Sequence, residues 1–291
     1  MRPALLSLGI APLSLLLVLG CSSSQLGTSD TNSAGGAPPA AVCTAPGYAT
    51  DSAPTALTEV DATISDPSGK ALTALPVQVC GIDKCINGMS GKAGATAVKV
   101  NTSLTRPAFK YGDGFDYAEL AVQLGKEAKQ DLGKIVALPL PAFADGAAFP
   151  KSGNVTNGDV TLSLAAGVTV VHDTLTYEDD TDLVLRSVAI PVADSTQALD
   201  PSFNFELGYA LAPLGTTFCP AAQLSLKNSL NWDPGTEVEI FIQGLDVAEG
   251  WAPYGTWLQV AEGSVSADGS SIDSTSGGIP ILSAVAVRRK K

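Results

Sequence analysis

Apolar and polar residues alternate in many short stretches of the chain. In residues 58–66 (TEVDATISD), for example, Val60, Ala62 and Ile64 fall on one side and mostly polar residues on the other. Successive side chains of a β-strand point to opposite faces, so this period of two predicts half-buried strands. Since no helical stripe is sustained, we expect an all-β protein. Comparable patterns occur in residues 76–80, 95–100, 160–164, 168–172, 183–192, 224–226, 237–242, 257–261, 263–267 and 281–287.

One stretch, residues 116–124 (DYAELAVQL), is rich in Ala and Leu and fits a helix by composition. A period of two places Ala118, Leu120 and Val122 on one face, whereas helical spacing gives a poorer apolar stripe. We therefore expect a strand here. The following residues, 126–132, are expected to form a short helix or a loop.

A proline-rich stretch, residues 137–150 (ALPLPAFADGAAFP), separates two groups of predicted strands. Proline cannot donate a hydrogen bond to a strand ladder, so such a stretch is typical of a boundary. We expect two β-sandwich-like modules, residues 43–140 and residues 141–291, each built from short strands and regular turns.

The chain begins with Arg2 and an apolar run, residues 5–21 (LLSLGIAPLSLLLVLGC). A positive start, an apolar core and a small residue before a cut site form a secretory signal. The run is shorter than the roughly 20 uninterrupted apolar residues of a membrane-spanning helix. Residues 1–20 are therefore expected to be a signal peptide.

The end of this run, Val18-Leu19-Gly20-Cys21, resembles the lipobox of bacterial lipoproteins, although that pattern prefers a small residue at the place of Leu19. The resemblance implies cleavage after Gly20 and acylation of Cys21 on its thiol and its new amino group. Ser22, in place of Asp, implies delivery to the outer membrane. The alternative is an ordinary secretory signal that leaves Cys21 as an unpaired thiol.

The next residues, 22–41 (SSSQLGTSDTNSAGGAPPAA), carry almost no hydrophobic bulk. Such a composition cannot bury enough apolar surface to offset chain entropy. We expect residues 21–42 to be an acylated cysteine followed by a disordered tether, which would hold the folded body near a membrane.

The chain is acidic, with a formal net charge of −12 and a pI near 4.4. Nucleic acids attract basic surfaces, so nucleic-acid binding is not expected. The one dense basic run, residues 288–291 (RRKK), is more typical of a solvated tail than of a binding site.

Four cysteines follow Cys21, and an even number in an exported protein favours disulfides. Sequence alone allows three pairings. We prefer Cys80–Cys85, which closes a short loop, with Cys43–Cys219. The rival is a zinc site, but one C-x4-C spacing in a chain with a single histidine fits zinc poorly.

Residues 60–85 (VDATISDPSGKALTALPVQVCGIDKC) resemble the carboxypeptidase regulatory-like, transthyretin-like β-sandwich. The matching pieces are the turn at residues 66–69, the strand at 76–79 and Gly94-Ala95. The family's aspartate before the third strand is missing from residues 90–94. The chain also resembles myxobacterial envelope lipoproteins. The resemblance implies a non-catalytic accessory or binding module.

His172 is the only histidine, so at most one imidazole-based triad is possible. Asp173 adjoins it, but neighbours on a strand point to opposite faces. No G-x-S-x-G sequence is present. We expect no enzymatic activity, with an extracytoplasmic hydrolase as the remote alternative.

Two clusters carry the candidate binding residues. Residues 178–182 (EDDTD) offer carboxylates to a calcium ion through Glu178, Asp179, Asp180 and Asp182, or form a solvated turn. The aromatic cluster could stack on sugars or form an interface hot spot, or could be core. Its members are Trp251, Tyr254 and Trp257, with Trp232 nearby.

These patterns together predict a lipid-anchored protein of the bacterial cell envelope with a non-catalytic structural or binding role. Its expected partners are membrane lipid, through acylated Cys21, and envelope proteins or glycans. The alternative is a carbohydrate- or calcium-dependent ligand-binding module. Apart from that calcium ion, no cofactor is expected.

Overall fold

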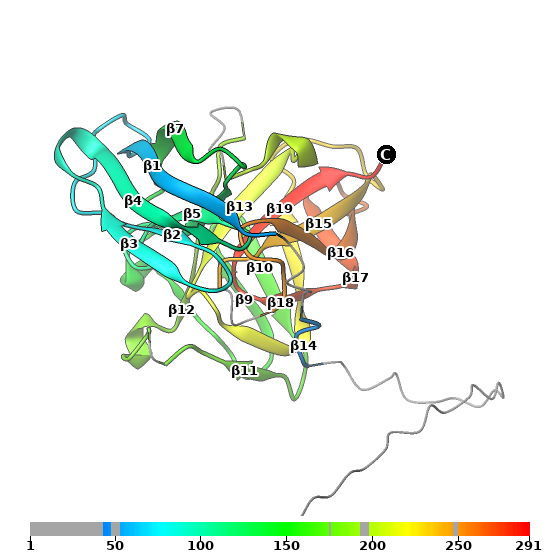
Figure 1. Ribbon diagram of the computed structural model, residues 1–291. Coiled ribbons are helices and arrows are strands. Elements are labelled where there is room, and N and C mark those ends of the chain that lie inside the picture. Colours follow the sequence, from blue (N-terminus) through cyan, green and yellow to red (C-terminus); the bar gives the residue numbers. More distant parts are fainter. Residues whose placement is uncertain (1–42, 48–52, 175, 193–197, 247–249) are drawn as a thin grey trace, which may run out of the picture. The chain divides into compact units, whose positions relative to one another are not determined.

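The computed structural model describes residues 43–47, 53–174, 176–192, 198–246 and 250–291. The predicted signal peptide, the lipobox with Cys21 and the tether lie outside these residues. The described residues belong to one compact unit (Figure 1). No helix in the described ranges is long and apolar enough to cross a membrane.

Strands dominate the described residues, and helical structure there is limited to single 3-10 turns, which confirms the all-β prediction. Runs rich in valine, leucine and isoleucine with frequent glycine turns favour strands over helices, because branched side chains pack well on a pleated surface. The turns are η1 (Lys92–Gly94), η2 (Phe143–Asp145), η3 (Asp180–Asp182) and η4 (Pro201–Phe203).

The N-terminal strands form two sheets that face each other over a core containing Val60, Ile64, Val77, Val79 and Phe109, all at most 1% exposed. In the three-stranded sheet, β1 pairs antiparallel with β4 and parallel with β7. The second sheet has the order β3-β2-β5-β6. The strands are β1 (Thr55–Ser65), β2 (Pro76–Cys80), β3 (Cys85–Met89), β4 (Ala95–Leu104), β5 (Ala108–Tyr111), β6 (Leu120–Gln123) and β7 (Lys129–Val136).

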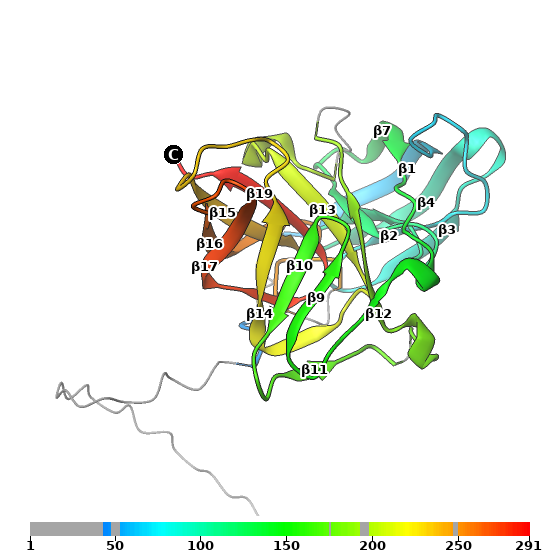
Figure 2. The ribbon, with the colours of Figure 1, turned by 180° about the vertical axis from the view of Figure 1, so that it is seen from behind.

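The remaining strands form one twelve-stranded sheet with the order β8-β12-β13-β19-β15-β16-β17-β14-β10-β9 and with β11 and β18 paired to β14 (Figure 2). The strands are β8 (Ala147–Ala148), β9 (Gly153–Asn157), β10 (Val160–Leu164), β11 (Thr169–Val171), β12 (Val184–Ala189), β13 (Leu207–Ala212), β14 (Thr217–Lys227), β15 (Glu237–Gln243), β16 (Trp257–Val265), β17 (Ser271–Gly277), β18 (Ile279–Ile281) and β19 (Ala284–Arg289).

This large sheet curls almost into a barrel. Strand β9 at one end approaches β12 near the other end, where the Ser187 N–H donates to Asn157 Oδ1 at 2.8 Å and the Ser187 hydroxyl donates to the Asn157 carbonyl at 2.6 Å. Leu162, Leu224 and Ile240 belong to the apolar cluster inside. Curling of this kind hides strand edges that would otherwise be free to pair.

Gln243 connects the two groups of strands. Its Nε2 donates to the Ala121 carbonyl at 2.8 Å, and its Oε1 accepts from the Ala121 N–H at 3.2 Å. The amide thus pairs with edge strand β6 as a neighbouring strand would.

The strands before the proline-rich stretch belong to the two smaller sheets, and the strands from β8 onward belong to the large sheet. One buried cluster nevertheless contains residues of both groups. The predicted division at residues 140 and 141 stays a prediction.

Arg186 lies between the same two parts and is only 1% exposed. Its guanidinium donates to the carbonyls of Phe115 (2.6 Å), Pro141 (3.2 Å) and Gly114 (3.1 Å), and its Cζ lies 3.7 Å from the centre of the Phe143 ring. Burial lowers the pKa of this guanidinium from its usual value. The side chain ties a turn of the N-terminal sandwich and the proline-rich stretch to the barrel.

The expectation of a helix or loop in residues 126–132 holds for residues 126–128 but is wrong for residues 129–132, because strand β7 begins at Lys129. Its buried residues, Leu132 and Ile135, are three positions apart. Gly133 between them has a φ of +61°, and the pairing with β1 shifts register there. This bulge inserts a residue and conceals the period of two.

The basic run at residues 288–291 is not simply a solvated tail. Strand β19 continues to Arg289, and three of the four cations pair with glutamates of neighbouring segments. The nitrogen–oxygen pairs are Arg288–Glu239 (2.6 Å), Arg289–Glu206 (2.6 Å) and Lys290–Glu262 (2.9 Å).

Candidate functional site

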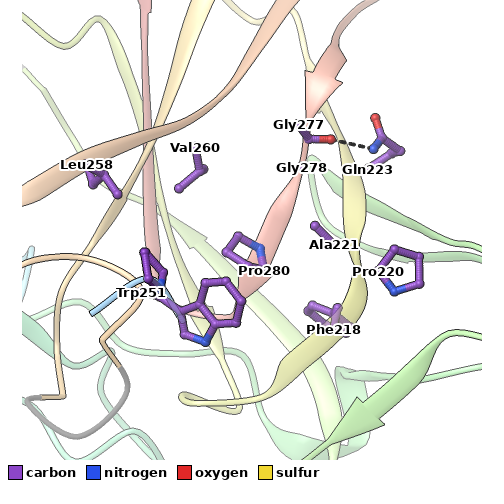
Figure 3. A pocket seen from close by; sticks show the side chains of 11 residues that line it. Phe218, Pro220, Ala221, Gln223, Trp251, Leu258, Val260, Gly277, Gly278 and Pro280 are labelled. Carbon is purple, nitrogen blue, oxygen red and sulfur yellow. Dashed lines mark hydrogen bonds between the residues drawn. The ribbon is translucent and has the colours of Figure 1, made fainter. Parts of the chain in front are cut away.

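An apolar groove of about 440 Å³ opens on the barrel and is the candidate site (Figure 3). Its walls come from β14, β16, β18, the corner between β17 and β18, and two loops. Figure 3 shows Trp251 and the side chains of β14 around Pro280. The lining residues are Pro46, Phe218, Pro220, Ala221, Gln223, Trp251, Leu258, Val260, Gly277, Gly278 and Pro280.

Glycines shape the corner between β17 and β18. Gly277 has a φ of +73°, and a Cβ on it would lie 2.3 Å from the Val260 carbonyl oxygen. A Cβ on Gly278 would lie 2.7 Å from the Ala222 carbonyl oxygen. Only glycine tolerates both the close approach and the positive φ at such a corner. The two residues let the chain leave β16 and join β14, and this turn builds one end of the groove.

Gln223 contributes the one amide side chain of the groove lining, and the Trp251 indole carries the other polar side-chain atom. Its Nε2 donates to the Gly277 carbonyl at 2.7 Å, and its Oε1 accepts from the Ser274 hydroxyl at 3.0 Å. Both ends of this amide are therefore hydrogen-bonded to residues of β17. The groove presents Trp, Phe, Pro, Leu and Val side chains to a ligand, as ligand pockets commonly do.

A short strap, residues 43–47, closes one side of the groove. Pro46 belongs to the lining, and the Gly47 N–H donates to the Gly250 carbonyl at 3.2 Å, next to Trp251. Cys43 is bonded to Cys219. Since Cys219 lies between two lining residues of β14, this disulfide fixes the strap at the groove.

Both predicted disulfides are confirmed. Cys80 and Cys85 lie opposite each other in the β2–β3 hairpin, with their Cα atoms 4.0 Å apart. The second bridge, Cys43–Cys219, spans 176 positions of sequence. The two bridges use all four of these cysteines, so none of the four is left to bind zinc.

The predicted aromatic platform is not assembled as one surface. Trp251 is half-buried and lines the groove. Tyr254 and Trp257 are each 4% exposed and Trp232 is 9% exposed. The Trp257 Nε1 donates to the Ala198 carbonyl at 2.9 Å, and burial raises the pKa of the Tyr254 hydroxyl. Of the three candidate binding residues, Trp251 alone is placed to meet a ligand in the groove.

The acidic segment at 178–182 contains turn η3 (Asp180–Asp182), with Asp179 as its N-cap. Asp179 Oδ1 accepts from the Thr181 N–H at 3.0 Å, and this bond lowers the pKa of Asp179. Glu178, Asp179 and Asp180 are exposed. Across the part of the chain that the structure describes, no group of three or more acidic, histidine or cysteine residues is arranged to hold a metal. The predicted calcium ligands, with Asp182, are therefore not brought together.

His172 lies at the end of β11, where its Nδ1 is 3.0 Å from the Thr216 hydroxyl. Burial lowers the pKa of this imidazole, and nearby Asp180 opposes the shift. Its sequence neighbour Asp173 accepts from the Thr176 hydroxyl at 2.5 Å. The imidazole packs against Phe149 at 5.5 Å between ring centres, which is the environment of a structural histidine.

A second, polar cavity of about 100 Å³ has no counterpart in the sequence predictions. Lys110 Nζ and Glu119 Oε1 are 3.0 Å apart at its wall. Burial raises the pKa of Glu119, and Lys110 opposes the shift. Several carboxylates line this cavity, but Asp113 already accepts three backbone N–H groups at 2.9 Å.

Most groove residues were missed by sequence reasoning. Phe218, Leu258 and Pro280 come from three different strands and carry no motif. Their only signal is apolar character, which core residues share. Trp251 was found because it belongs to a cluster of aromatic residues in the sequence, with Tyr254 and Trp257 close by.

No family model matches the chain, and no curated protein matches it. Among solved structures, it is similar to a protein of Bacteroides uniformis ATCC 8492 described as a "putative carbohydrate binding protein". The alignment covers 80% of this chain and 98% of that chain, with 8% identity and a TM-score of 0.23. A likeness at that TM-score supports no argument, so function is inferred from the groove itself.

Proposed function

We propose that the protein is a non-catalytic binding protein, held at the bacterial cell envelope by lipid on Cys21, and that the groove receives the apolar part of its ligand. The observation that carries the proposal is the groove lining, in which Trp251 and other mainly apolar side chains face a cavity and the one amide side chain, Gln223, is already bonded at both ends.

The lining favours an apolar ligand over a sugar. Burying apolar surface is worth roughly 25 cal/mol per Å², so an apolar group gains from each wall it touches. A sugar could stack one face on Trp251, but its hydroxyl groups would need partners on the other side. Among the lining side chains only Gln223 and the Trp251 indole carry polar atoms, and the Gln223 amide already holds two hydrogen bonds within the protein. A glycan is therefore the second candidate, supported by Trp251 alone.

The proposed location is supported by the leader and by the disulfides. The lipobox resemblance places the anchor at Cys21, and the two bridges suit an oxidising, extracytoplasmic compartment. Mass spectrometry of the mature amino terminus tests the anchor directly. A Cys21→Ser variant should lose the acyl mass and leave the membrane fraction; retention of the variant in membranes would contradict the proposed anchor.

Binding is tested with the neutral apolar probe 1-N-phenylnaphthylamine and, in parallel, with a glycan array. Trp251→Ala should raise the probe's Kd by about tenfold or more, since an apolar side chain contributes roughly 1.5–3 kcal/mol when fully buried. Leu230→Ala is the matched control, because Leu230 is 42% exposed and lies outside the groove lining. Equal affinity of both variants would refute the groove; a glycan signal that depends on Trp251 would favour the sugar.

A further inference from the structure

The strap is attached to the groove at its two ends. Cys43 is bonded to Cys219 in β14, and the Gly47 N–H donates to the Gly250 carbonyl. Pro46, between these points, forms part of the wall. Residues 43–47 belong to no strand. The strap is therefore positioned by a covalent bond and not by a sheet ladder.

The two disulfides differ in what they hold. The Cys80–Cys85 bridge joins residues that the β2–β3 ladder already places opposite each other, with Cys80 1% exposed and Cys85 exposed. The strap bridge joins an exposed residue, Cys43, to a half-buried one, Cys219. A thiolate needs access to a sulfur in order to exchange with it, and each bridge has one exposed residue. Only the strap bridge holds a segment of the groove wall, so its opening is the one that alters the groove.

We propose that the Cys43–Cys219 disulfide is a redox-sensitive latch on the groove, and that its reduction by a dithiol releases Pro46 from the wall and weakens binding of the apolar ligand. The ligand part of this inference rests on the proposed function. The release of the strap does not, because it concerns only the wall that Pro46 and the neighbouring Trp251 form.

The chemistry is a balanced thiol–disulfide exchange. A thiolate of the reductant attacks the exposed Cys43 sulfur, forms a mixed disulfide there and releases Cys219 as a thiolate, which takes up a proton. The second thiol of the reductant then attacks its own sulfur in the mixed disulfide and releases Cys43. Two electrons and two protons pass to the protein, and the reductant becomes a disulfide. By linkage, a ligand that prefers the latched groove also protects the bridge from reduction.

The test uses the full mature chain with Cys21→Ser, so that no acyl group or extra thiol is present. Affinity for 1-N-phenylnaphthylamine is measured before and after reduction, with circular dichroism to confirm that the fold is kept. Reduction should raise the Kd about tenfold, the scale of one lost apolar contact. Cys43→Ser/Cys219→Ser should bind weakly with or without reductant. Cys80→Ser/Cys85→Ser is the matched control and should weaken on reduction as the parent does.

Pro46→Gly provides a second variant, in which the bridge is kept and the wall is lost, and it should also bind weakly. Equal Kd values for oxidised and reduced folded protein would overturn the latch. If the oxidised protein binds no probe, the proposed function fails, and the latch is then judged by acrylamide quenching. Trp232 and Trp257 are buried, so quenching reports on Trp251. Reduction should increase it, and unchanged quenching would overturn the latch independently.

Discussion

Replacing Gln243 by leucine tests how the barrel holds the N-terminal sandwich. Leucine keeps the apolar volume but removes both bonds to Ala121, so a buried N–H and a buried carbonyl on edge strand β6 lose their partners. Each unsatisfied buried group costs about 1–3 kcal/mol. The expected loss is about 4 kcal/mol, which corresponds to a fall in Tm of about 8–16 °C for a domain of this size.

Thermal and urea unfolding of Gln243→Leu measure this loss, and Gln259→Leu is the matched control. Gln259 lies on β16 and is exposed, so its replacement should change the free energy of unfolding by less than about 0.5 kcal/mol. If the two variants unfold within about 1 kcal/mol of each other, the Gln243 amide is not replacing a strand neighbour, and the reasoning is refuted.

A Gln243→Glu variant tests the direction in which folding stability changes with pH. A neutral carboxylic acid can donate to the Ala121 carbonyl and accept from its N–H as the amide does, whereas a carboxylate cannot donate. Burial should raise the folded-state pKa of this residue above the unfolded value of about 4.3. The free-energy cost of this substitution, relative to the parent at the same pH, should therefore be smallest below about pH 4 and should grow as pH rises through the folded pKa. A cost that shrinks as pH rises would contradict this.

Three further outcomes are expected. Arg186→Met should lower the free energy of unfolding by about 3 kcal/mol, because one buried and two part-buried carbonyls lose their donor. Urea melts that match the parent would contradict this. The pKa of Asp268 is lowered to about 2, chiefly by the hydrogen bond that it accepts from the Ser266 hydroxyl. Its contribution to folding stability is therefore present above about pH 4 and is lost as pH falls toward 2. In Asp268→Asn, the free energy of unfolding should fall less steeply over this pH range than in the parent. Removing the Cys43–Cys219 bridge should lower the free energy of unfolding by about 5 kcal/mol, and removing the Cys80–Cys85 bridge by about 2 kcal/mol, because the first bridge closes a far longer loop. Equal melting temperatures of the two variants would argue against this entropic explanation.

The regular strands were predictable because the alternation of buried and less buried residues can be read within each strand's own sequence. In β10, Val160, Leu162 and Leu164 are buried and alternate with half-buried Thr161 and Ser163. Such a pattern needs no knowledge of the partner strand. The pairing of the disulfides was only a preference among three that the sequence allows, and it was based on one pair being five positions apart.

Strands with bulges and glycines were not predictable in the same way. Residues 257–261 and 263–267 looked like two strands, but β16 is continuous from Trp257 to Val265 and shifts register against β17 after Glu262. Strand β3 contains Gly88, a residue type that is depleted in strands. A Cβ there would lie 3.0 Å from a methyl carbon of Val98, so the glycine allows close packing within the strand.

The groove could not be predicted because its walls are far apart in sequence. Pro46 and Pro280 lie at opposite ends of the folded chain and meet only through the pairing of β14 with β18 and the bridge to Cys219. Similarly, Tyr254 and Trp257 were grouped with Trp251 by proximity in sequence, although the structure buries them. Proximity along a chain does not decide which side of a sheet a residue faces.

The Cys43–Cys219 bridge also determines how mechanical load enters the protein. A pull on the residues that precede Cys43 passes through the bridge into β14 of the barrel and bypasses β1. The opposite end of the chain follows β19, which belongs to the same twelve-stranded sheet. A stretched protein would therefore carry tension across the barrel while the N-terminal sandwich stays slack, and that sandwich would keep its contacts under forces that deform the sheet beside it.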